Sequence, residues 1–282
     1  MSSVIIGASG YIGRGLFKKF ERNNVIGTSS KASKDLLKFD LSSFDSKDLS
    51  FVSSGDYVFL LSAISSPDIC ANNTDYAKKI NLTGTKELIS EALKRNAKVV
   101  FFSSDTVYGN SEESFDEFKI PAPIGIYANM KNEVERTYLG DKNFKSLRLS
   151  YVFSMNDKFT RFAYECYRNN MTVDVFHPFS RSIIYYDDLI EAISFLPDKW
   201  DSLNTGVINC CGPETLSRKD FVRYLTKHAF PGLKYKSFNP GVDFFNSRPR
   251  VIRMKSKFFY DLLGREPLKI DFAIKKEYEK KE

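Results

Sequence analysis

The sequence predicts an α/β protein with a doubly wound parallel sheet, on two observations. Short apolar runs alternate along the chain with longer segments of helical periodicity, which is typical of a parallel sheet covered by helices. A glycine-rich turn also follows the first apolar run, Val4–Ile6, directly. With 282 residues, 42% of them hydrophobic and 27% charged, the chain has the composition of a folded globular protein.

The first half of the chain follows this alternation closely. Six strands are expected, at residues 4–6, 25–27, 37–39, 58–61, 99–102 and 146–149. Helices are expected between them, over about 11–20, 75–95 and 126–138. The second half is less regular, with strands expected at 172–175, 183–186 and 207–209 and helices at 158–168, from 187, and after a cap at Ser217.

The balance of charge is basic. Lysine and arginine number 42 and aspartate and glutamate 35, which gives a net charge of +7. Because acidic and basic residues are interspersed, this indicates a mild attraction for an anionic small molecule and argues against a nucleic-acid-binding stripe. Solubility alone would also explain the excess.

Metal, membrane and secretion signals are not found in the sequence. Four cysteines without a CxxC pair and two distant histidines predict neither a metal site nor a disulfide framework. The N-terminal residues lack the pattern of a signal peptide, and the longest apolar run is far below the roughly 20 residues that span a bilayer. We therefore expect a cytoplasmic protein without membrane contact.

Residues 7–13 read Gly-Ala-Ser-Gly-Tyr-Ile-Gly, a GxxGxxG between a strand and a helix. Glycines let the backbone turn tightly and approach a pyrophosphate, whose charge a helix N-terminus stabilises. The position of the motif predicts a dinucleotide site, and the alternative is a turn that serves packing alone. The expected cofactor contacts are Gly7, Ser9, Gly10, Tyr11, Ile12 and Gly13.

The end of the second strand bears on the choice of cofactor, because NAD sites usually carry an acidic residue there. The residues at this position are Thr28, Ser29, Ser30 and Lys31. Hydroxyls and a cation suit a 2′-phosphate, so NADP(H) is favoured over NAD(H). Asp40 and Leu41, after the third strand, are expected beside the adenine, although Asp40 would equally serve as a strand-end cap.

Tyr127 and Lys131 lie four residues apart on an expected helix and therefore on one face of it. A phenol has an ordinary pKa near 10, and a nearby ammonium group would lower that pKa toward the working range of a proton donor. The alternative is an exposed Tyr–Lys pair without a function. Ser104 favours the first interpretation, because it ends the preceding strand at the edge where ligands bind in such sheets.

Together, the glycine turn, Ser104 and the Tyr127–Lys131 pair resemble an extended short-chain dehydrogenase/reductase of the NAD-dependent epimerase/dehydratase superfamily. Within it, the residues Ser-Ser-Asp-Thr-Val-Tyr-Gly at 103–109 are similar to the S-T-D-x-V-F of sugar-nucleotide 4-ketoreductases of the dTDP-4-dehydrorhamnose reductase type. Two later segments, 181–189 and 248–264, also follow this pattern. The resemblance covers nearly the whole chain.

This resemblance implies a Rossmann-type domain of residues 1–150 plus about 181–198. It implies a smaller, interleaved α/β substrate domain of residues 151–180 and 199–282. Leu61, Ser62 and Ala63 stand where many relatives have two alanines and are expected to form the floor of the cofactor site.

The resemblance also implies the substrate contacts. Arg181 and Arg248 would bind a nucleotide diphosphate, a task suited to guanidinium groups, although each could equally form a surface ion pair. Dehydratases of the superfamily carry Asp-Glu where this chain has Asp105 and Thr106, and Thr106 cannot act as their base. Water elimination is therefore disfavoured. Ser104, Asp105 and Thr106 are also expected at the substrate, although Asp105 could equally be a structural acceptor.

The sequence thus predicts an NADPH-dependent reductase of a nucleotide-diphosphate-linked 4-keto-deoxysugar, which by resemblance would feed surface polysaccharide biosynthesis. Tyr127 would donate the proton, Lys131 would tune Tyr127 and hold the cofactor ribose, and Ser104 would orient the carbonyl. One alternative is a sugar-nucleotide epimerase with tightly bound NAD. Another is a non-catalytic NADP-binding regulatory subunit. A homodimer is a further expectation, because helices flanking such sheets often dimerise.

Overall fold

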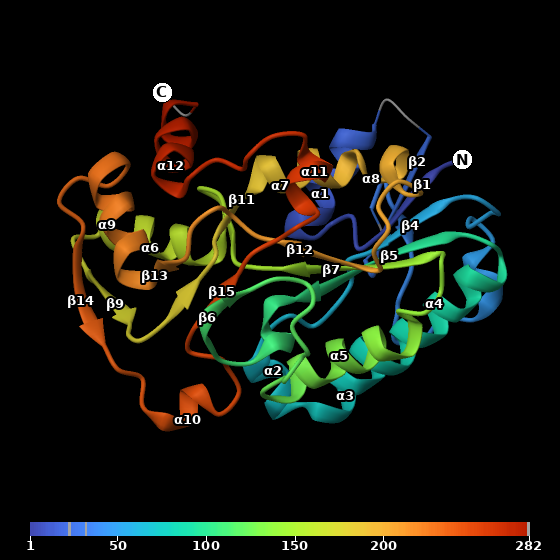
Figure 1. The fold of residues 1–282 in the computed structure, drawn as a ribbon, viewed down its shortest axis with the longest axis horizontal. Helices are drawn as coiled ribbons and strands as arrows, with labels where there is room; N and C mark the ends of the chain where they lie inside the picture. The colour runs from blue at the N-terminus through green and yellow to red at the C-terminus, as the bar shows by residue number, and fades with distance from the viewer. Residues whose placement is uncertain (22–23, 32, 281–282) are drawn as a thin grey trace.

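A computed structural model describes residues 1–21, 24–31 and 33–280. Its centre is a sheet of seven parallel strands in the order β12-β7-β5-β4-β1-β2-β3. Most of these strands are labelled in Figure 1. The strands are β1 (Ser3–Ile6), β2 (Val25–Ser29), β3 (Leu37–Lys38), β4 (Tyr57–Leu60), β5 (Lys98–Ser104), β7 (Phe144–Leu149) and β12 (Val207–Cys210). The predicted doubly wound, Rossmann-like fold is confirmed.

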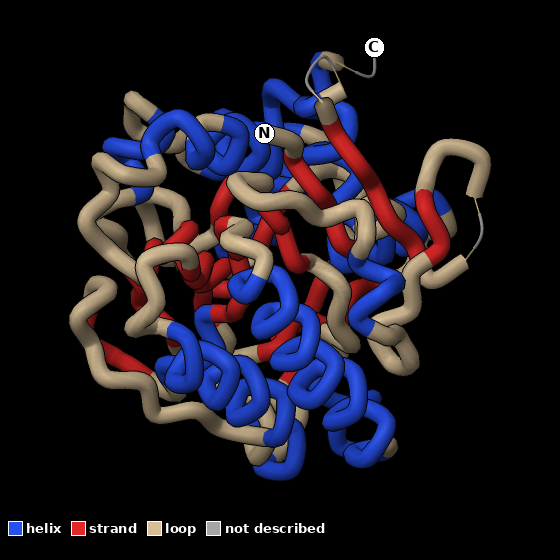
Figure 2. Tube along the Cα trace, turned by 90° about the vertical axis from the view of Figure 1, so that its right-hand side faces the viewer, coloured by secondary structure: helices blue, strands red, loops and turns tan. Residues whose placement is uncertain are grey.

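Helices cover both faces of this sheet, and Figure 2 shows the strands between the two helical layers. One layer contains α1 (Tyr11–Phe20), α7 (Tyr186–Ser194), α8 (Leu196–Lys199) and α11 (Phe259–Leu263). The other contains α2 (Pro67–Asn72), α3 (Thr74–Lys78), α4 (Thr85–Lys94) and α5 (Ile126–Tyr138). Side chains alternate between the two faces along each strand. Ile5 therefore packs in the apolar core on the face covered by α1, α7 and α11, whereas Val4 and Ile6 pack in the core on the opposite face.

The segment expected as one helix over about 75–95 is broken. A π-helical stretch, Lys79–Gly84, separates α3 from α4. A side chain at Gly84 would lie 2.0 Å from the carbonyl oxygen of Leu41, so only glycine lets the loop after β3 approach this closely. Within the stretch, the amide of Asn81 bonds both the N–H and the carbonyl of Ile64, at 2.8 and 2.9 Å. The break therefore fixes the loop that follows β4.

The C-terminal part has its own core, which contains Phe153, Val175, Phe221 and Ile274. Its helices are α6 (Lys158–Arg168), α9 (Arg218–His228), α10 (Val242–Phe245) and α12 (Ile270–Glu279). Its paired strands are β8 (Val152–Phe153) with β11 (Ile184–Tyr185), β9 (Thr172–Phe176) with β14 (Lys234–Phe238), and β10 (Ser180–Arg181) with β13 (Leu216–Ser217). A further pair, β6 (Ser111–Phe115) with β15 (Ile252–Met254), joins this part to the chain after β5.

The predicted division of the chain differs from the structure in two segments. Residues 199–282 were expected in the substrate domain, but β12 pairs with β7 and completes the main sheet. In addition, Phe259 and Leu262 of α11 are buried in the cluster above that sheet. Both segments belong to the larger body because their apolar side chains are covered there, which strand spacing alone does not reveal.

Among the described helices, none is long and apolar enough to cross a bilayer. The described residues also bring together no group of three or more His, Cys, Asp and Glu side chains that could hold a metal ion. All four cysteines are buried and free.

Candidate active site

The three predicted catalytic residues lie at the carboxyl edge of β5 and on the adjoining helix α5. Lys131 is buried and donates to the carbonyl oxygen of Phe102 at 2.7 Å, two residues before Ser104 ends the strand. Its ammonium nitrogen is 5.9 Å from the ring centroid of Tyr127. The i,i+4 spacing thus places both side chains against the end of β5, as the sequence predicts.

The pKa values at this site differ from the expectation. Burial raises the pKa of Tyr127 well above its ordinary value, and the nearby Cys70 and Asp105 act in the same direction. Burial also lowers the pKa of Lys131 to about 8, against partial opposition from Glu135. The expected lowering of the pKa of Tyr127 by Lys131 is therefore not found, because the loss of solvent dominates at this buried site. At neutral pH the phenol carries its proton, which is the state needed for proton donation.

A buried ion pair anchors the helix that carries Tyr127 and Lys131. Glu135 on α5 and Arg148 on β7 are 2.7 Å apart, with side chains 0% and 3% exposed. Ser146 donates to Glu135 at 2.7 Å, and Arg148 donates to the hydroxyl of Tyr108, also at 2.7 Å. Each charge is thus paired and hydrogen-bonded, as buried charges must be.

Removing the negative charge of Glu135 should destabilise the protein strongly. We expect Glu135→Gln to lower the free energy of unfolding by about 3 kcal/mol, because Arg148 is left buried without its counter-ion. The measurement is urea unfolding followed by circular dichroism. Glu133→Gln on the same helix is the matched control, since its pair with Lys86 is exposed and should contribute less than about 1 kcal/mol. Equal effects of the two variants would contradict the account.

The glycine turn has the geometry expected of a dinucleotide site. Gly7 has a φ of +95°, and a side chain there would collide with Ser62. Ser62 thus lies directly against the glycine turn. A side chain at Gly13 would lie 2.2 Å from the carbonyl oxygen of Gly7. Helix α1 begins at Tyr11, and its N-cap, Gly10, provides no side chain to cap the first-turn amides. These amides and the close backbone approach suit a pyrophosphate.

The residues predicted to surround the adenosine divide into two groups. Thr28 and Ser29 are buried, and their hydroxyls accept from the N–H groups of Gly7 and Lys31, both at 3.3 Å. Ser30 and Lys31 are exposed. The first two side chains therefore support the loop, whereas the last two are accessible to a phosphate.

Asp40 shows the capping role that was its alternative. Its carboxylate accepts from the N–H and the hydroxyl of Ser42, at 2.9 and 2.7 Å, and these bonds lower its pKa. Leu41 is buried, with its carbonyl against Gly84. Leu61 and Ala63 flank Ser62 and are partly exposed.

Arg181 does not fit the diphosphate role that was predicted for it. Its guanidinium donates to the carbonyl oxygens of Ser180 and Pro249, both at 2.7 Å, and of Arg250 at 3.2 Å. Its Nε lies 3.5 Å from Asp105. The side chain is 8% exposed, and burial lowers its pKa to about 10. Because its donors are used within the chain, Arg181 is a structural residue here.

Arg248 is better placed for an anionic ligand. Its guanidinium lies over the ring of Phe244, 4.5 Å from the centroid, and forms a 2.5 Å ion pair with Asp68 on α2. The neighbouring Ser247 packs so closely on Gly125 that a side chain there would lie 2.8 Å from its backbone. Gly125 immediately precedes α5. Arg248 therefore lies near the helix of Tyr127, and its partner Asp68 is two-thirds exposed.

Several contacts at this edge were not predicted. The hydroxyl of Tyr11 bonds that of Ser154 at 2.6 Å and so joins the glycine turn to the loop after β8. Cys70 is buried beside the Tyr127–Lys131 pair, where Asn81 bonds its sulfur at 3.6 Å. Asn81 followed closely by a glycine inside an expected helix was a usable signal of a local break. The Tyr11–Ser154 contact has no local signal, because 143 residues separate the partners.

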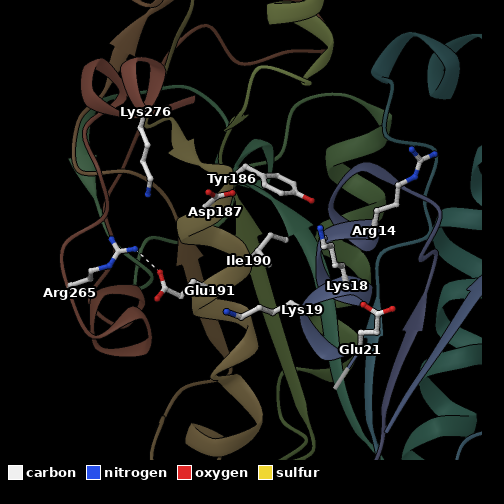
Figure 3. Close-up of a pocket in the computed structure, with 11 residues that line it drawn as sticks. Arg14, Lys18, Lys19, Glu21, Tyr186, Asp187, Ile190, Glu191, Arg265 and Lys276 are labelled. Atoms are coloured by element: carbon white, nitrogen blue, oxygen red, sulfur yellow. Dashed lines mark hydrogen bonds and ion pairs between the residues drawn. The ribbon is translucent and has the colours of Figure 1, made fainter. Parts of the chain in front are cut away.

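A hollow of about 980 Å³ lies apart from the three predicted catalytic residues, between α1, α7 and the C-terminal segments (Figure 3). Arg14, Lys18 and Lys19 reach it from α1, and Tyr186 from α7 points toward that helix. Arg265, opposite, is paired with Glu191 at 2.6 Å. This is a solvated groove between helices whose cations are largely exposed. It does not include Ser104, Tyr127 or Lys131.

The fold and this site define a dinucleotide-binding α/β protein with a Ser, a Tyr and a Lys grouped at the carboxyl end of its sheet. The chain belongs to the NAD dependent epimerase/dehydratase family, which it matches over residues 3–211. It is therefore an extended short-chain dehydrogenase/reductase, as predicted.

Solved structures confirm the fold over nearly the full length. A hypothetical dTDP-4-dehydrorhamnose reductase from Sulfolobus tokodaii is 25% identical, with a TM-score of 0.81 over 96% of this chain and 98% of that chain. The dTDP-4-dehydrorhamnose reductase from Clostridium acetobutylicum is 22% identical, with a TM-score of 0.82 over 99% of both chains. A UDP-glucuronic acid 4-epimerase from Bacillus cereus, bound to UDP-glucuronic acid and NAD, is 18% identical, with a TM-score of 0.80 over 99% of this chain and 98% of that chain.

Curated relatives carry a different name. Methionine adenosyltransferase 2 subunit beta from Bos taurus is 28% identical over 142 residues, 48% of this chain and 42% of that protein. The match thus covers less than half the length of this relative. It is named as a subunit of a transferase and not as a reductase.

Proposed function

We propose that this chain is an NADPH-dependent reductase of a nucleotide-linked 4-keto-deoxysugar that serves surface polysaccharide biosynthesis. The observation that supports it most is the grouping of Ser104, a protonated Tyr127 and a buried Lys131 at one edge of the sheet. An idle subunit has no physical need for a buried lysine, because desolvating its charge is unfavourable. The likeness to dTDP-4-dehydrorhamnose reductases supports the same class.

The residues divide the work as follows. When bound, the nicotinamide supplies the hydride that reduction of a carbonyl requires. The hydroxyl of Ser104 donates to the carbonyl oxygen and holds it beside Tyr127. Tyr127 then gives its phenolic proton to the developing alkoxide. Lys131 stabilises the phenolate left behind, since an ammonium group favours an adjacent anion.

The cofactor would lie along the glycine turn. The amides of Tyr11, Ile12 and Gly13 would bind the pyrophosphate, and Ser62 and Gly7 would form the floor. Lys131 would also hold the nicotinamide ribose. At the adenosine end, the exposed Ser30 and Lys31 favour a 2′-phosphate and hence NADP(H), although the similar UDP-glucuronic acid 4-epimerase holds NAD.

Reversing the charge of Lys31 tests this preference. We expect Lys31→Glu to weaken NADPH binding about tenfold and to leave NADH binding within about twofold, because only NADPH places a phosphate beside that side chain. Dissociation constants come from quenching of protein fluorescence. Lys34→Glu, also exposed and nearby, is the matched control. A loss that is equal for both cofactors would contradict the assignment.

The substrate would be a sugar linked to a nucleoside diphosphate. Arg248 would bind the diphosphate in place of Asp68, because a guanidinium forms two parallel bonds to such oxygens. Similar structures hold UDP-glucose or UDP-glucuronic acid. The nucleobase is left to experiment. The cytoplasmic location and the homodimer stay predictions.

Turnover with a panel of nucleotide sugars tests the function. The purified protein is mixed with NADPH and dTDP-4-dehydrorhamnose, and with the corresponding UDP and GDP 4-keto sugars. Loss of NADPH absorbance equal to the sugar reduced supports the reductase. Copurified NAD that survives gel filtration, with interconversion of UDP-glucose and its 4-epimer, would instead establish an epimerase.

A non-catalytic subunit is the second candidate, and the likeness to methionine adenosyltransferase 2 subunit beta favours it. It predicts that NADPH binds but is not oxidised by any sugar of the panel. It also predicts a complex with a methionine adenosyltransferase catalytic chain in gel filtration. These two results together would overturn the reductase.

A further inference from the structure

Ser104 has an unusual set of hydrogen bonds for a side chain expected to orient a substrate. Its oxygen accepts from the backbone N–H of Thr106 at 3.2 Å and from the hydroxyl of Thr106 at 3.0 Å. Its own proton points to the carboxylate of Asp105, 3.3 Å away. A hydroxyl has one proton and two acceptor lone pairs. Thr106 therefore occupies both lone pairs, and Ser104 can act only as a donor.

The acceptor of that proton is held in place and does not approach closely. Asp105 is buried, accepts from the hydroxyl of Ser150 at 3.2 Å, and faces the Nε of Arg181 at 3.5 Å. Arg181 is in turn bonded to the carbonyl oxygen of Pro249. The carboxylate is thus fixed from two other elements. Its contact with Ser104, at 3.3 Å, is longer than an ordinary hydrogen bond from a hydroxyl donor.

These contacts limit the hydrogen bonds that Ser104 can form with the carbonyl oxygen of a bound substrate. The hydroxyl of Ser104 can donate its hydrogen bond to one of two acceptors. These are the carboxylate of Asp105, 3.3 Å away, and a substrate oxygen at ordinary hydrogen-bond length. Since the lone pairs stay occupied, the hydroxyl does not accept a bond from Tyr127 or from water. Bonds donated to its oxygen also polarise the hydroxyl and strengthen the bond that it donates.

We propose that Thr106 is a positioning residue for the reaction, which makes Ser104 an obligate donor to the substrate carbonyl, with Asp105 as the acceptor at rest. This rests on the proposed reductase function. It gives Thr106 a role at the position where dehydratases carry a glutamate. The hydroxyl of Thr106 cannot remove a proton from the substrate as a glutamate would. It instead orients the O–H bond of Ser104.

The test uses Thr106→Val, which removes the hydroxyl but keeps the shape and the backbone N–H. With NADPH and the 4-keto sugar that the wild type reduces best, we expect kcat to fall about five- to tenfold, the effect of one lost hydrogen bond. KM should stay within about twofold. Thr106→Ser, which restores the hydroxyl, should recover most of the turnover. Unchanged thermal unfolding and NADPH binding would show that each variant is folded.

A double-mutant cycle separates positioning from a general structural effect. In a Ser104→Ala background, we expect Thr106→Val to have no further effect on kcat, because the hydroxyl that it directs is gone. A fall in kcat of the same size in both backgrounds would overturn the proposal. So would a raised KM with unchanged kcat, or no recovery in Thr106→Ser. If the wild type showed no turnover, the proposed function would be overturned together with this proposal. That result is obtained with the wild type alone, before any variant is compared.

Discussion

Replacing Tyr127 by Phe is expected to lower kcat for reduction of the keto sugar by about 10²- to 10⁴-fold, the usual contribution of a positioned acid. The phenol carries its proton at neutral pH, because burial raises its pKa. It is therefore ready to donate as the carbonyl becomes an alkoxide. Phe keeps the ring against Lys131 and removes only the hydroxyl group that carries the proton. Steady-state rates of NADPH oxidation at saturating sugar measure the effect.

Two controls give this result its meaning. Tyr76→Phe changes an exposed tyrosine on α3 and should leave kcat unchanged. NADPH binding by Tyr127→Phe should match the wild type, which shows that the site is intact. If Tyr127→Phe kept more than about half of the wild-type kcat, proton donation by Tyr127 would be wrong.

Replacing Lys131 by Met should abolish turnover and yet stabilise the fold. The pKa of Lys131 is lowered from 10.5 to about 8, so burying its charge is unfavourable by about 3 kcal/mol at neutral pH. Met has a similar length and no charge. After loss of the bond to Phe102, we expect a net gain of about 2 kcal/mol in the free energy of unfolding at pH 7. Urea unfolding measures it.

The pH dependence of this gain has a definite sign. Below pH 8 Lys131 is charged in both the folded and the unfolded protein, and the full burial penalty applies. Between pH 8 and 10.5 the folded protein loses the proton first, so the wild type recovers stability and the advantage of Lys131→Met shrinks. Arg136→Met, which removes an exposed cation of the same helix, is the control. A gain that is constant from pH 7 to 10 would contradict the account.

Local sequence patterns predicted the main elements because periodicity reports which side chains are buried. Helices α5 and α6 have the bounds expected from the sequence, 126–138 and 158–168, and Ser217 caps α9 as expected. The π-helical stretch at 79–84 was missed, since its cause is the approach of Leu41 to Gly84 from elsewhere in the chain. The place of β12 in the main sheet was missed for a related reason. Strand pairing depends on neighbours that are distant in sequence.

The site was predictable to the same extent. Spacing placed Tyr127 and Lys131 on one helical face, and Lys131 bonds the strand that Ser104 ends. The direction of the pKa shift of Tyr127 was not predictable, because it depends on how much solvent the fold removes. The bonds of Arg181 to main-chain carbonyls come from the segment at 249–250, which no local pattern connects to it. Polar side chains reveal their partners only in three dimensions.

Isotope transfer tests the central claim most directly. The protein is incubated with NADPH deuterated at the transferable position of its nicotinamide and with dTDP-4-dehydrorhamnose, and the sugar product is analysed by mass spectrometry and NMR. The account predicts one deuterium per product molecule, bound to the former carbonyl carbon, and none with Tyr127→Phe on the same timescale. A cofactor that binds tightly but keeps all its deuterium in the presence of every keto sugar tested would contradict it.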